Sequence, residues 1–302
     1  MSAFIRAVDR LSPTLAAAIT YPFITGAVRR RPVRDRELTT HDAARRETIV
    51  AGGRRVVVYE WGSGPDVVLL VHGWAGRAAQ FATIVRELLF EGYRVVAFDA
   101  PACGDSPGRR THLGEFRAVV DALAARESHG LHAIVAHSAG ALVAITAAVE
   151  DGISSRIVAI APVLRFRALG EAFARITGFG ERARLLQEVW LTARLRRKRV
   201  DLADRYDLIA RERPAGLGLT IVHDPADVMA DIEDSRTLAA LHPGEVDLIE
   251  VAGLGHGRIL EADVTLDAVL RAVGTPATSG ALARSGRTSP RKDLRTAGRT
   301  AT

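Results

Sequence analysis

Cysteine is almost absent from this sequence. The 302 residues include a single cysteine, Cys103, so a disulfide framework within the chain is excluded and nothing requires an oxidising compartment. Aromatic residues are also scarce, at 5%, although 48% of the chain is hydrophobic. Aliphatic side chains must therefore form most of the core, and the length is sufficient for one large domain, or for a domain with an insertion. We expect a cytoplasmic protein.

The chain has little net charge outside its C-terminal end. Of the formal net charge of +6, the segment 275–302 contributes +5, from six basic residues and one acidic residue. The remainder is nearly neutral, which argues against a nucleic-acid partner. The segment 275–302 is rich in Ser, Thr, Gly, Ala and Arg, a composition that predicts a disordered basic tail.

A long, strongly apolar run is missing as well. Residues 11–28 carry no charge, but they contain Pro13 and Pro22 and are only modestly hydrophobic. A bilayer-spanning helix needs about 20 strongly apolar residues. We therefore assign residues 1–46 to an N-terminal helical extension with a helix packed on the domain, and contact of this segment with a membrane is the alternative.

From residue 47 onward, short apolar runs alternate with amphipathic stretches. This alternation predicts an α/β fold with a doubly wound, mostly parallel sheet, because strand–helix–strand units cross over on both faces of such a sheet. Runs that predict strands cover residues 54–61, 66–73, 93–101, 131–138, 155–162, 217–224 and 245–253. The first two are separated by the turn sequence GSGP, which predicts that they pair as a hairpin.

Residues 163–214 interrupt this rhythm. They show helical periodicity, many charges and no clear strand. We interpret them as a helical cap inserted into a core formed by residues 47–162 and 215–274. Such caps cover the carboxyl ends of the strands, where functional groups gather in open α/β sheets.

The polar residues at these strand ends form a recognisable set. A serine, an acid and a histidine occur in the order Ser138, Asp227, His256, within the sequences IVAHSAGAL, IVHDPAD and GLGHGRIL. Two further loops read LLVHGW and FDAPACGDSPG. Together these motifs resemble the α/β-hydrolase superfamily, over roughly residues 47–273. The sequence departs from the usual pattern in having alanine at positions 102 and 136, where glycine is more common, and Cys103 in the second loop.

The resemblance implies a role for each residue. Ser138 would be the nucleophile, His256 its general base, and Asp227 the acid that orients the histidine. The backbone N–H groups of Trp74 and Ala139 would form the oxyanion hole.

Four further residues belong to the same loops. We expect His72 and Gly73 to form the oxyanion loop, with His72 bracing it by hydrogen bonding. His137 is expected to shape the pocket entrance, and Cys103 to be a small residue of the pocket wall or a loop. No zinc-ligand spacing or glycine-rich phosphate loop occurs, so neither a metal nor a cofactor is expected.

Each assignment has a simpler alternative. Ser138 could merely cap the helix that follows it, as serine often does. Asp224, Asp231 or Asp99 could be the acid in place of Asp227. His256 could be an ordinary exposed loop residue.

A serine hydrolase acting on a small-molecule ester or related acyl bond is the function that the resemblance implies. Members of the superfamily that open epoxides or remove halides place an aspartate at the elbow, where this chain has serine. An acyltransferase or thioesterase with the same three residues is one alternative, and a non-catalytic ligand-binding protein is another. The oligomeric state is not predicted.

Overall fold

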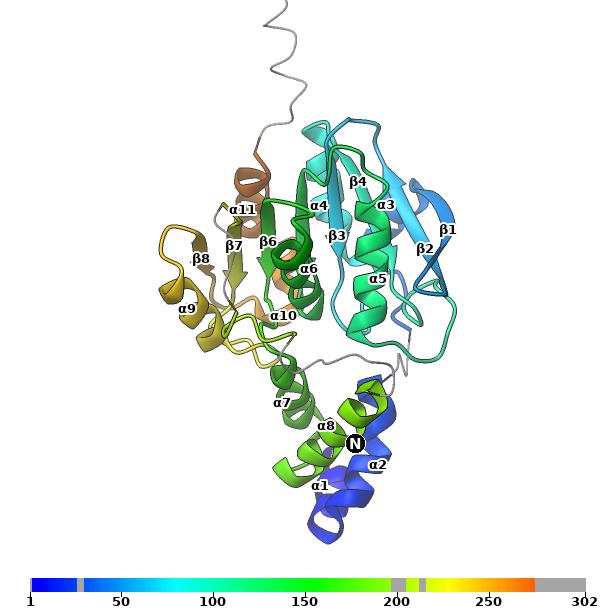
Figure 1. The fold of residues 1–302 in the computed structure, drawn as a ribbon, viewed down its shortest axis with the longest axis vertical. Coiled ribbons are helices and arrows are strands. Elements are labelled where there is room, and N and C mark those ends of the chain that lie inside the picture. Colours follow the sequence, from blue (N-terminus) through cyan, green and yellow to red (C-terminus); the bar gives the residue numbers. More distant parts are fainter. Residues whose placement is uncertain (1, 26–29, 197–204, 212–215, 275–302) are drawn as a thin grey trace, which may run out of the picture.

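A computed structural model describes residues 2–25, 30–196, 205–211 and 216–274 of the chain. The predicted disordered tail, residues 275–302, lies outside these described residues. The described elements form an α/β sheet domain and a smaller helical lobe beneath it (Figure 1).

The sheet has eight strands in the order β1-β2-β4-β3-β5-β6-β7-β8. Its pairs are parallel from β4 onward, whereas β2 runs antiparallel to both β1 and β4. The doubly wound, mostly parallel sheet predicted from the sequence is thus confirmed. The strands are β1 (Arg45–Ala51), β2 (Arg54–Trp61), β3 (Val67–Val71), β4 (Arg94–Asp99), β5 (Ala133–His137), β6 (Arg156–Ile160), β7 (Gly218–His223) and β8 (Val246–Glu250).

The predicted hairpin between residues 54–61 and 66–73 is wrong. β2 pairs with β1 through the turn at Gly52 and Gly53, which both have positive φ. β3 instead lies between β4 and β5, in the middle of the sheet. The connection after β2 therefore crosses β4. The GSGP turn sequence suggested a hairpin and did not indicate this crossover. β1 begins at Arg45, just inside the expected N-terminal extension.

Helices cover both faces of the sheet. Alternate side chains of β3 enter different apolar clusters: Val67, Leu69 and Val71 pack in one, and Val68 and Leu70 in the other. A strand buried on both faces reads as a continuous apolar run, as VVLLV does. The first face carries α5 (Leu113–Ala124), α6 (Ala139–Asp151) and α9 (Ile232–Leu241); the second carries α4 (Ala82–Phe90) and α11 (Asp263–Val273), with α3 (Asp35–Asp42) beside α4 (Figure 1).

The lobe beneath the sheet combines two distant parts of the chain. We call it the distal lobe; it consists of α1 (Ser2–Leu11), α2 (Pro13–Thr25), α7 (Phe166–Thr177) and α8 (Glu181–Arg196) (Figure 1). Its own apolar cluster joins Ile5, Ala16 and Ala17 to Phe179 and Ala183. The N-terminal segment therefore forms two helices packed on the cap helices, rather than one helix packed on the sheet domain. No helix among the described residues is long and apolar enough to cross a bilayer.

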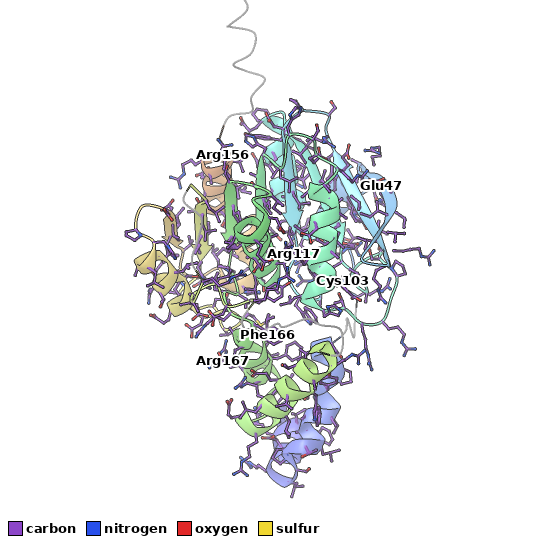
Figure 2. All side chains as sticks on the ribbon, in the orientation of Figure 1. Glu47, Cys103, Arg117, Arg156, Phe166 and Arg167 are labelled. Carbon is purple, nitrogen blue, oxygen red and sulfur yellow. The ribbon has the colours of Figure 1, made fainter. Side chains whose placement is uncertain are left out.

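The two ends of the cap insertion lie side by side at the edge of the core. The Phe166 N–H donates to the Tyr206 carbonyl at 2.8 Å, and the Leu208 N–H donates to the Leu164 carbonyl at 3.0 Å. Phe166 lies at the junction between the sheet domain and the lobe (Figure 2). The return segment is fixed further by Glu150 of α6, whose carboxylate accepts hydrogen bonds from Arg205 and Arg211.

Candidate active site

Ser138 occupies a sharp turn between β5 and α6. Its φ of 55° and ψ of −124° lie in a region that a residue with a side chain rarely adopts, at a cost of about 1–3 kcal/mol. The turn requires glycine nearby: a Cβ on Gly140 would lie 2.4 Å from the Val71 carbonyl oxygen and 2.5 Å from that of His72. Ala136, by contrast, is an ordinary buried strand residue that pairs with Val71 and Ala159, so alanine is accommodated where the superfamily pattern has glycine.

Three of the predicted residues come together in a row. The Oγ of Ser138 lies 2.9 Å from the Nε2 of His256, and the Nδ1 of His256 lies 2.7 Å from the Oδ2 of Asp227. The Ser138 side chain makes no capping hydrogen bond to α6, so the simpler interpretation of this serine as a helix cap has no support. His256 lies in the one-turn helix α10 (Gly255–Arg258), rather than in the irregular loop expected.

The carboxylate of Asp227 is buried and held ionised. Its side chain is fully buried, and its Oδ1 accepts the N–H groups of Met229 at 2.7 Å and Ala230 at 3.2 Å. Burial by itself would raise the pKa of Asp227, but the hydrogen bond and charge of His256 and these two N–H groups lower the pKa below its usual value. The carboxylate therefore stays charged opposite the imidazole across the neutral pH range.

The other candidate acids have different partners. Asp224 accepts the N–H groups of Ala226, Leu254 and Gly255, so it ties the Asp227 loop to the loop that carries His256. Asp231 caps α9 through the Glu233 N–H. Asp99 accepts hydrogen bonds from the Ala78 N–H, the Tyr59 hydroxyl and the Asp105 N–H, none of which belongs to the loop of His256.

The loop that follows β3 passes directly against Ser138. A Cβ on Gly73 would lie 2.8 Å from the Cβ of Ser138, so only glycine permits this approach. His72 braces the loop: its Nε2 accepts the Ala100 N–H at 3.0 Å, which leaves Nδ1 to donate to the Gly73 carbonyl at 2.7 Å. Burial lowers the pKa of His72 and favours this neutral form. Trp74 follows in this loop, and Ala139 directly follows Ser138.

His137 and Cys103 lie behind the site instead of in the pocket. His137 is 5% exposed, and its Nε2 donates to the backbone carbonyl of His256 at 2.8 Å. Burial and the neighbouring His256 lower the pKa of His137 to about 3, so it is neutral. Cys103 belongs to the apolar core, and burial raises the pKa of its thiol to about 12. Neither is among the described residues that line the cavity. This corrects the expectation that His137 shapes the pocket entrance, whereas Cys103 lies in the loop after β4, one of the two positions expected for it.

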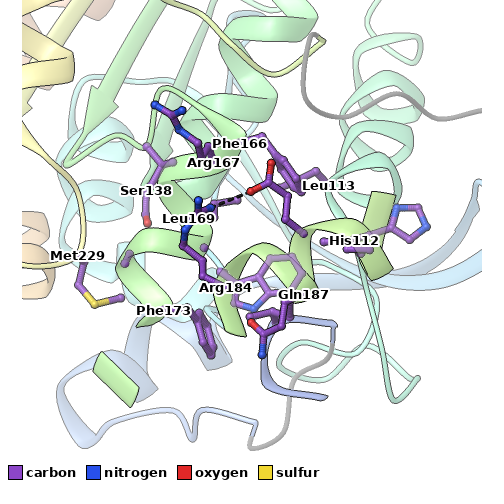
Figure 3. Close-up of a pocket in the computed structure, with 17 residues that line it drawn as sticks. His112, Leu113, Ser138, Phe166, Arg167, Leu169, Phe173, Arg184, Gln187 and Met229 are labelled. Carbon is purple, nitrogen blue, oxygen red and sulfur yellow. Dashed lines mark hydrogen bonds and ion pairs between the residues drawn. The ribbon is translucent and has the colours of Figure 1, made fainter. Parts of the chain in front are cut away.

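A cavity opens between Ser138 and the distal lobe (Figure 3). Trp74, Leu113 and Met229 line it on the side of the sheet domain, and Phe166 and Phe173 of α7 line it on the side of the lobe. The wall is mainly apolar. Its charged members include Arg184 and Glu188, which pair with each other at 2.8 Å.

Several wall residues were not foreseen from the sequence. Ile24 of α2 and Gln187 of α8 line the cavity, and the Gln187 Nε2 donates to the Ala17 carbonyl at 3.0 Å. This contact joins the N-terminal segment to the cap across a separation of 170 residues. Periodicity identifies each helix but not its partner, so no signal in the sequence predicted that α2 forms part of the wall.

Comparison with known proteins identifies the family of this chain. The profile of the Alpha/beta hydrolase family matches residues 68–272. This chain belongs to that family. The superfamily inferred from the sequence motifs is therefore confirmed. Among curated proteins, none matches the chain in sequence.

Solved structures share the fold at low sequence identity. An esterase of Pyrococcus furiosus is 18% identical, with 82% of this chain and 98% of that chain covered and a TM-score of 0.58. An α/β-hydrolase fold protein of Burkholderia ambifaria is 23% identical, with 74% and 97% covered and a TM-score of 0.56. An epoxide hydrolase of Vigna radiata is 17% identical, with 76% and 97% covered and a TM-score of 0.54. At these identities the comparisons establish the fold. The reaction of this hydrolase is therefore inferred from the geometry of its site.

Proposed function

We propose that this α/β hydrolase is a serine hydrolase that cleaves a carboxylic ester or related acyl bond through an acyl-enzyme on Ser138. The observation that carries the proposal is the unbroken row Ser138–His256–Asp227, with 2.9 Å and 2.7 Å separations, at the edge of an apolar cavity. A serine hydroxyl is a weak nucleophile until an adjacent base accepts its proton. The row supplies that base and an ionised carboxylate behind it.

The reaction follows from these positions. As the Ser138 oxygen attacks the substrate carbonyl, its proton moves to the Nε2 of His256, and Asp227 stabilises the resulting imidazolium. The backbone N–H groups of Trp74 and Ala139 stabilise the oxyanion, and losing one such donor typically costs about 3–4 kcal/mol. His256 then protonates the departing alcohol, and a water molecule, activated by the same histidine, releases the acid from Ser138.

The cavity wall favours an apolar substrate. Phe166, Phe173, Leu113 and Met229 offer hydrocarbon and aromatic surface, whose burial is worth about 25 cal/mol per Å². Arg184 is already paired with Glu188 and Glu181, so it does not present a free cation to a charged substrate. We therefore propose a small-molecule ester with an apolar acyl or aryl group.

A fluorophosphonate probe tests the proposal, because it labels an activated serine covalently. We expect the wild type to be labelled and to hydrolyse p-nitrophenyl acetate, and Ser138→Ala to do neither. Ser155→Ala is the matched control, since Ser155 is exposed just before β6, and it should behave as the wild type. Absence of labelling in the folded wild type would refute the proposed function.

A further inference from the structure

The distal lobe exposes a concentration of apolar side chains. Among the described residues, twelve large apolar side chains are exposed, and seven of them lie on its four helices. Single exposed apolar residues are ordinary, whereas a cluster of them marks an interaction surface. These seven are Phe4, Leu11, Leu15, Ile19, Ile176, Leu185 and Val189.

The N-terminal helices carry the clearest part of this surface. On α1, Phe4, Ala7 and Leu11 are exposed at a spacing that places them on one face of the helix. α2 contains no charged residue at all, and its exposed positions include Leu15 at 52% and Ile19 at 36%. The opposite face of α2 is buried in the lobe through Ala16 and Ala17. An uncharged helix with an apolar outer face is therefore presented to the surroundings.

The charge on the lobe is basic. Its four helices contain eight arginines and four acidic residues. The acids are largely engaged within the lobe: Asp9 accepts the Gly180 N–H at 2.8 Å, and Glu181 and Glu188 both pair with Arg184. Arg6 and Arg10, in contrast, are exposed on α1, the helix that carries Phe4 and Leu11. The outward surface thus combines apolar side chains with positive charge.

We infer that α1 and α2 dock the protein on the surface of an anionic lipid bilayer. The helices lie along the membrane, with the apolar faces of α1 and α2 in the boundary between head groups and acyl chains and with Arg6 and Arg10 against lipid phosphates. A second copy of this chain fits the surface less well, because self-association would bring two basic lobes together. The inference does not depend on the proposed chemistry. It places the cavity, to which α2 contributes Ile24, close to the membrane.

Sedimentation of the full chain with lipid vesicles tests the inference. The vesicles contain phosphatidylcholine alone or phosphatidylcholine with phosphatidylglycerol. We expect the wild type to bind the anionic vesicles and to bind the neutral ones at least about tenfold more weakly. The paired change Leu15→Gln and Ile19→Gln, which retains helix-forming residues, should weaken anionic binding about tenfold or more. The change Arg6→Gln with Arg10→Gln should act in the same direction.

A matched control uses exposed apolar residues of the sheet domain. Phe90 and Leu241 are 88% and 54% exposed, and Phe90→Gln with Leu241→Gln should leave binding unchanged. The basic segment 275–302 is identical in every variant, so it does not account for a difference between them. Thermal unfolding confirms that each variant is folded. Equal binding by the α2 variant and the wild type overturns the inference, as does association of the wild type with itself but not with vesicles.

Discussion

Asp224 and Asp227 lie close together in sequence, yet their carboxylates have different functions around His256. Asp227 contacts the imidazole itself, while Asp224 holds the backbone N–H groups of Leu254 and Gly255, just before the histidine. One acid orients the ring and the other positions the loop that carries it. His137 completes this support by donating to the His256 carbonyl.

Asp227→Asn tests this division at the level of a single residue. The amide retains the size of the side chain but removes the charge that stabilises the imidazolium, so kcat for p-nitrophenyl acetate should fall about 10³–10⁴-fold. Asp231→Asn is the matched control: Asp231 caps α9, so the variant should keep its activity. Steady-state kinetics on both variants decides the point, and full activity in Asp227→Asn would show that the acid is misassigned.

The residues of the row could be proposed from the sequence because parallel strands end at one edge of the sheet. Ser138, Asp227 and His256 each follow such a strand, so their convergence is a consequence of topology. The sequence did not indicate the direction of the His137 side chain. Side chains alternate between faces within a strand, but Ser138 lies beyond β5, in a turn with a φ of 55°. The contact of His137 with the His256 carbonyl therefore had no signal in the sequence.

At the scale of elements, the turn between β5 and α6 depends on the contact of α6 with the β3 loop. Gly140→Ala would place a methyl group about 2.4 Å from the Val71 carbonyl oxygen. Both sides of this contact are backbone, so we expect a loss of roughly 3 kcal/mol or more in the free energy of unfolding. In the control Gly218→Ala, the nearest atom is the Ser155 carbonyl oxygen, at 3.6 Å, and stability should stay within about 0.5 kcal/mol. Urea unfolding of the two variants measures the difference, and equal stabilities would contradict the close approach.

Glu150 joins three elements through its carboxylate. Arg117 of α5 and the return residues Arg205 and Arg211 donate to it at 2.5 Å, 2.6 Å and 2.9 Å. Burial alone would raise the pKa of Glu150, but hydrogen bonds from Arg205, Arg117 and Arg211 lower it to about 2. A lowered pKa contributes stability above the unfolded value of about 4.3, and this contribution is lost as the pH falls toward 2.

Glu150→Gln should therefore destabilise the protein at neutral pH, by about 1–2 kcal/mol after allowance for solvent screening. The difference from the wild type should shrink as the pH falls from about 4.3 toward 2. Urea unfolding across this range measures it, with the exposed Glu91→Gln as a control that changes little. A pH-independent difference would show that the carboxylate charge is not responsible.

Local sequence predicted most elements but not how they pair. The runs at 54–61 and 66–73 are both strands, yet the short GSGP segment does not join them as a hairpin, because β4 lies between them. β3 is buried on both faces because it lies in the middle of the sheet. Its fully apolar sequence is the feature that indicates this central position. β2, next to the edge strand β1, instead mixes buried, half-buried and exposed residues.

At the scale of the whole molecule, distant segments combine in ways that local patterns do not specify. The N-terminal helices pack on the cap, and Tyr21 of α2 contacts Trp190 of α8 with ring centroids 5.8 Å apart. Length, composition and strand alternation were sufficient for the sheet domain. The distal lobe depends on contacts between helices whose apolar faces are compatible with several partners, so it required the three-dimensional structure.

The molecule as a whole should lose stability in mild acid, because it buries several neutral histidines. Burial lowers the pKa of His41, His72, His137 and His223, that of His137 to about 3. In the unfolded chain they titrate near 6.5, so between about pH 6.5 and 5 the unfolded state binds more protons and stability falls with pH. Carboxylates titrate below this window, so they do not account for the loss. For His137 alone the loss amounts to about 2 kcal/mol over this range.

Calorimetric unfolding in buffers of different ionisation enthalpy should detect proton uptake, and His137→Gln should reduce that uptake by about one proton near pH 5. Unchanged uptake in this variant would mean that His137 is already protonated in the folded protein, which is incompatible with its burial beside His256.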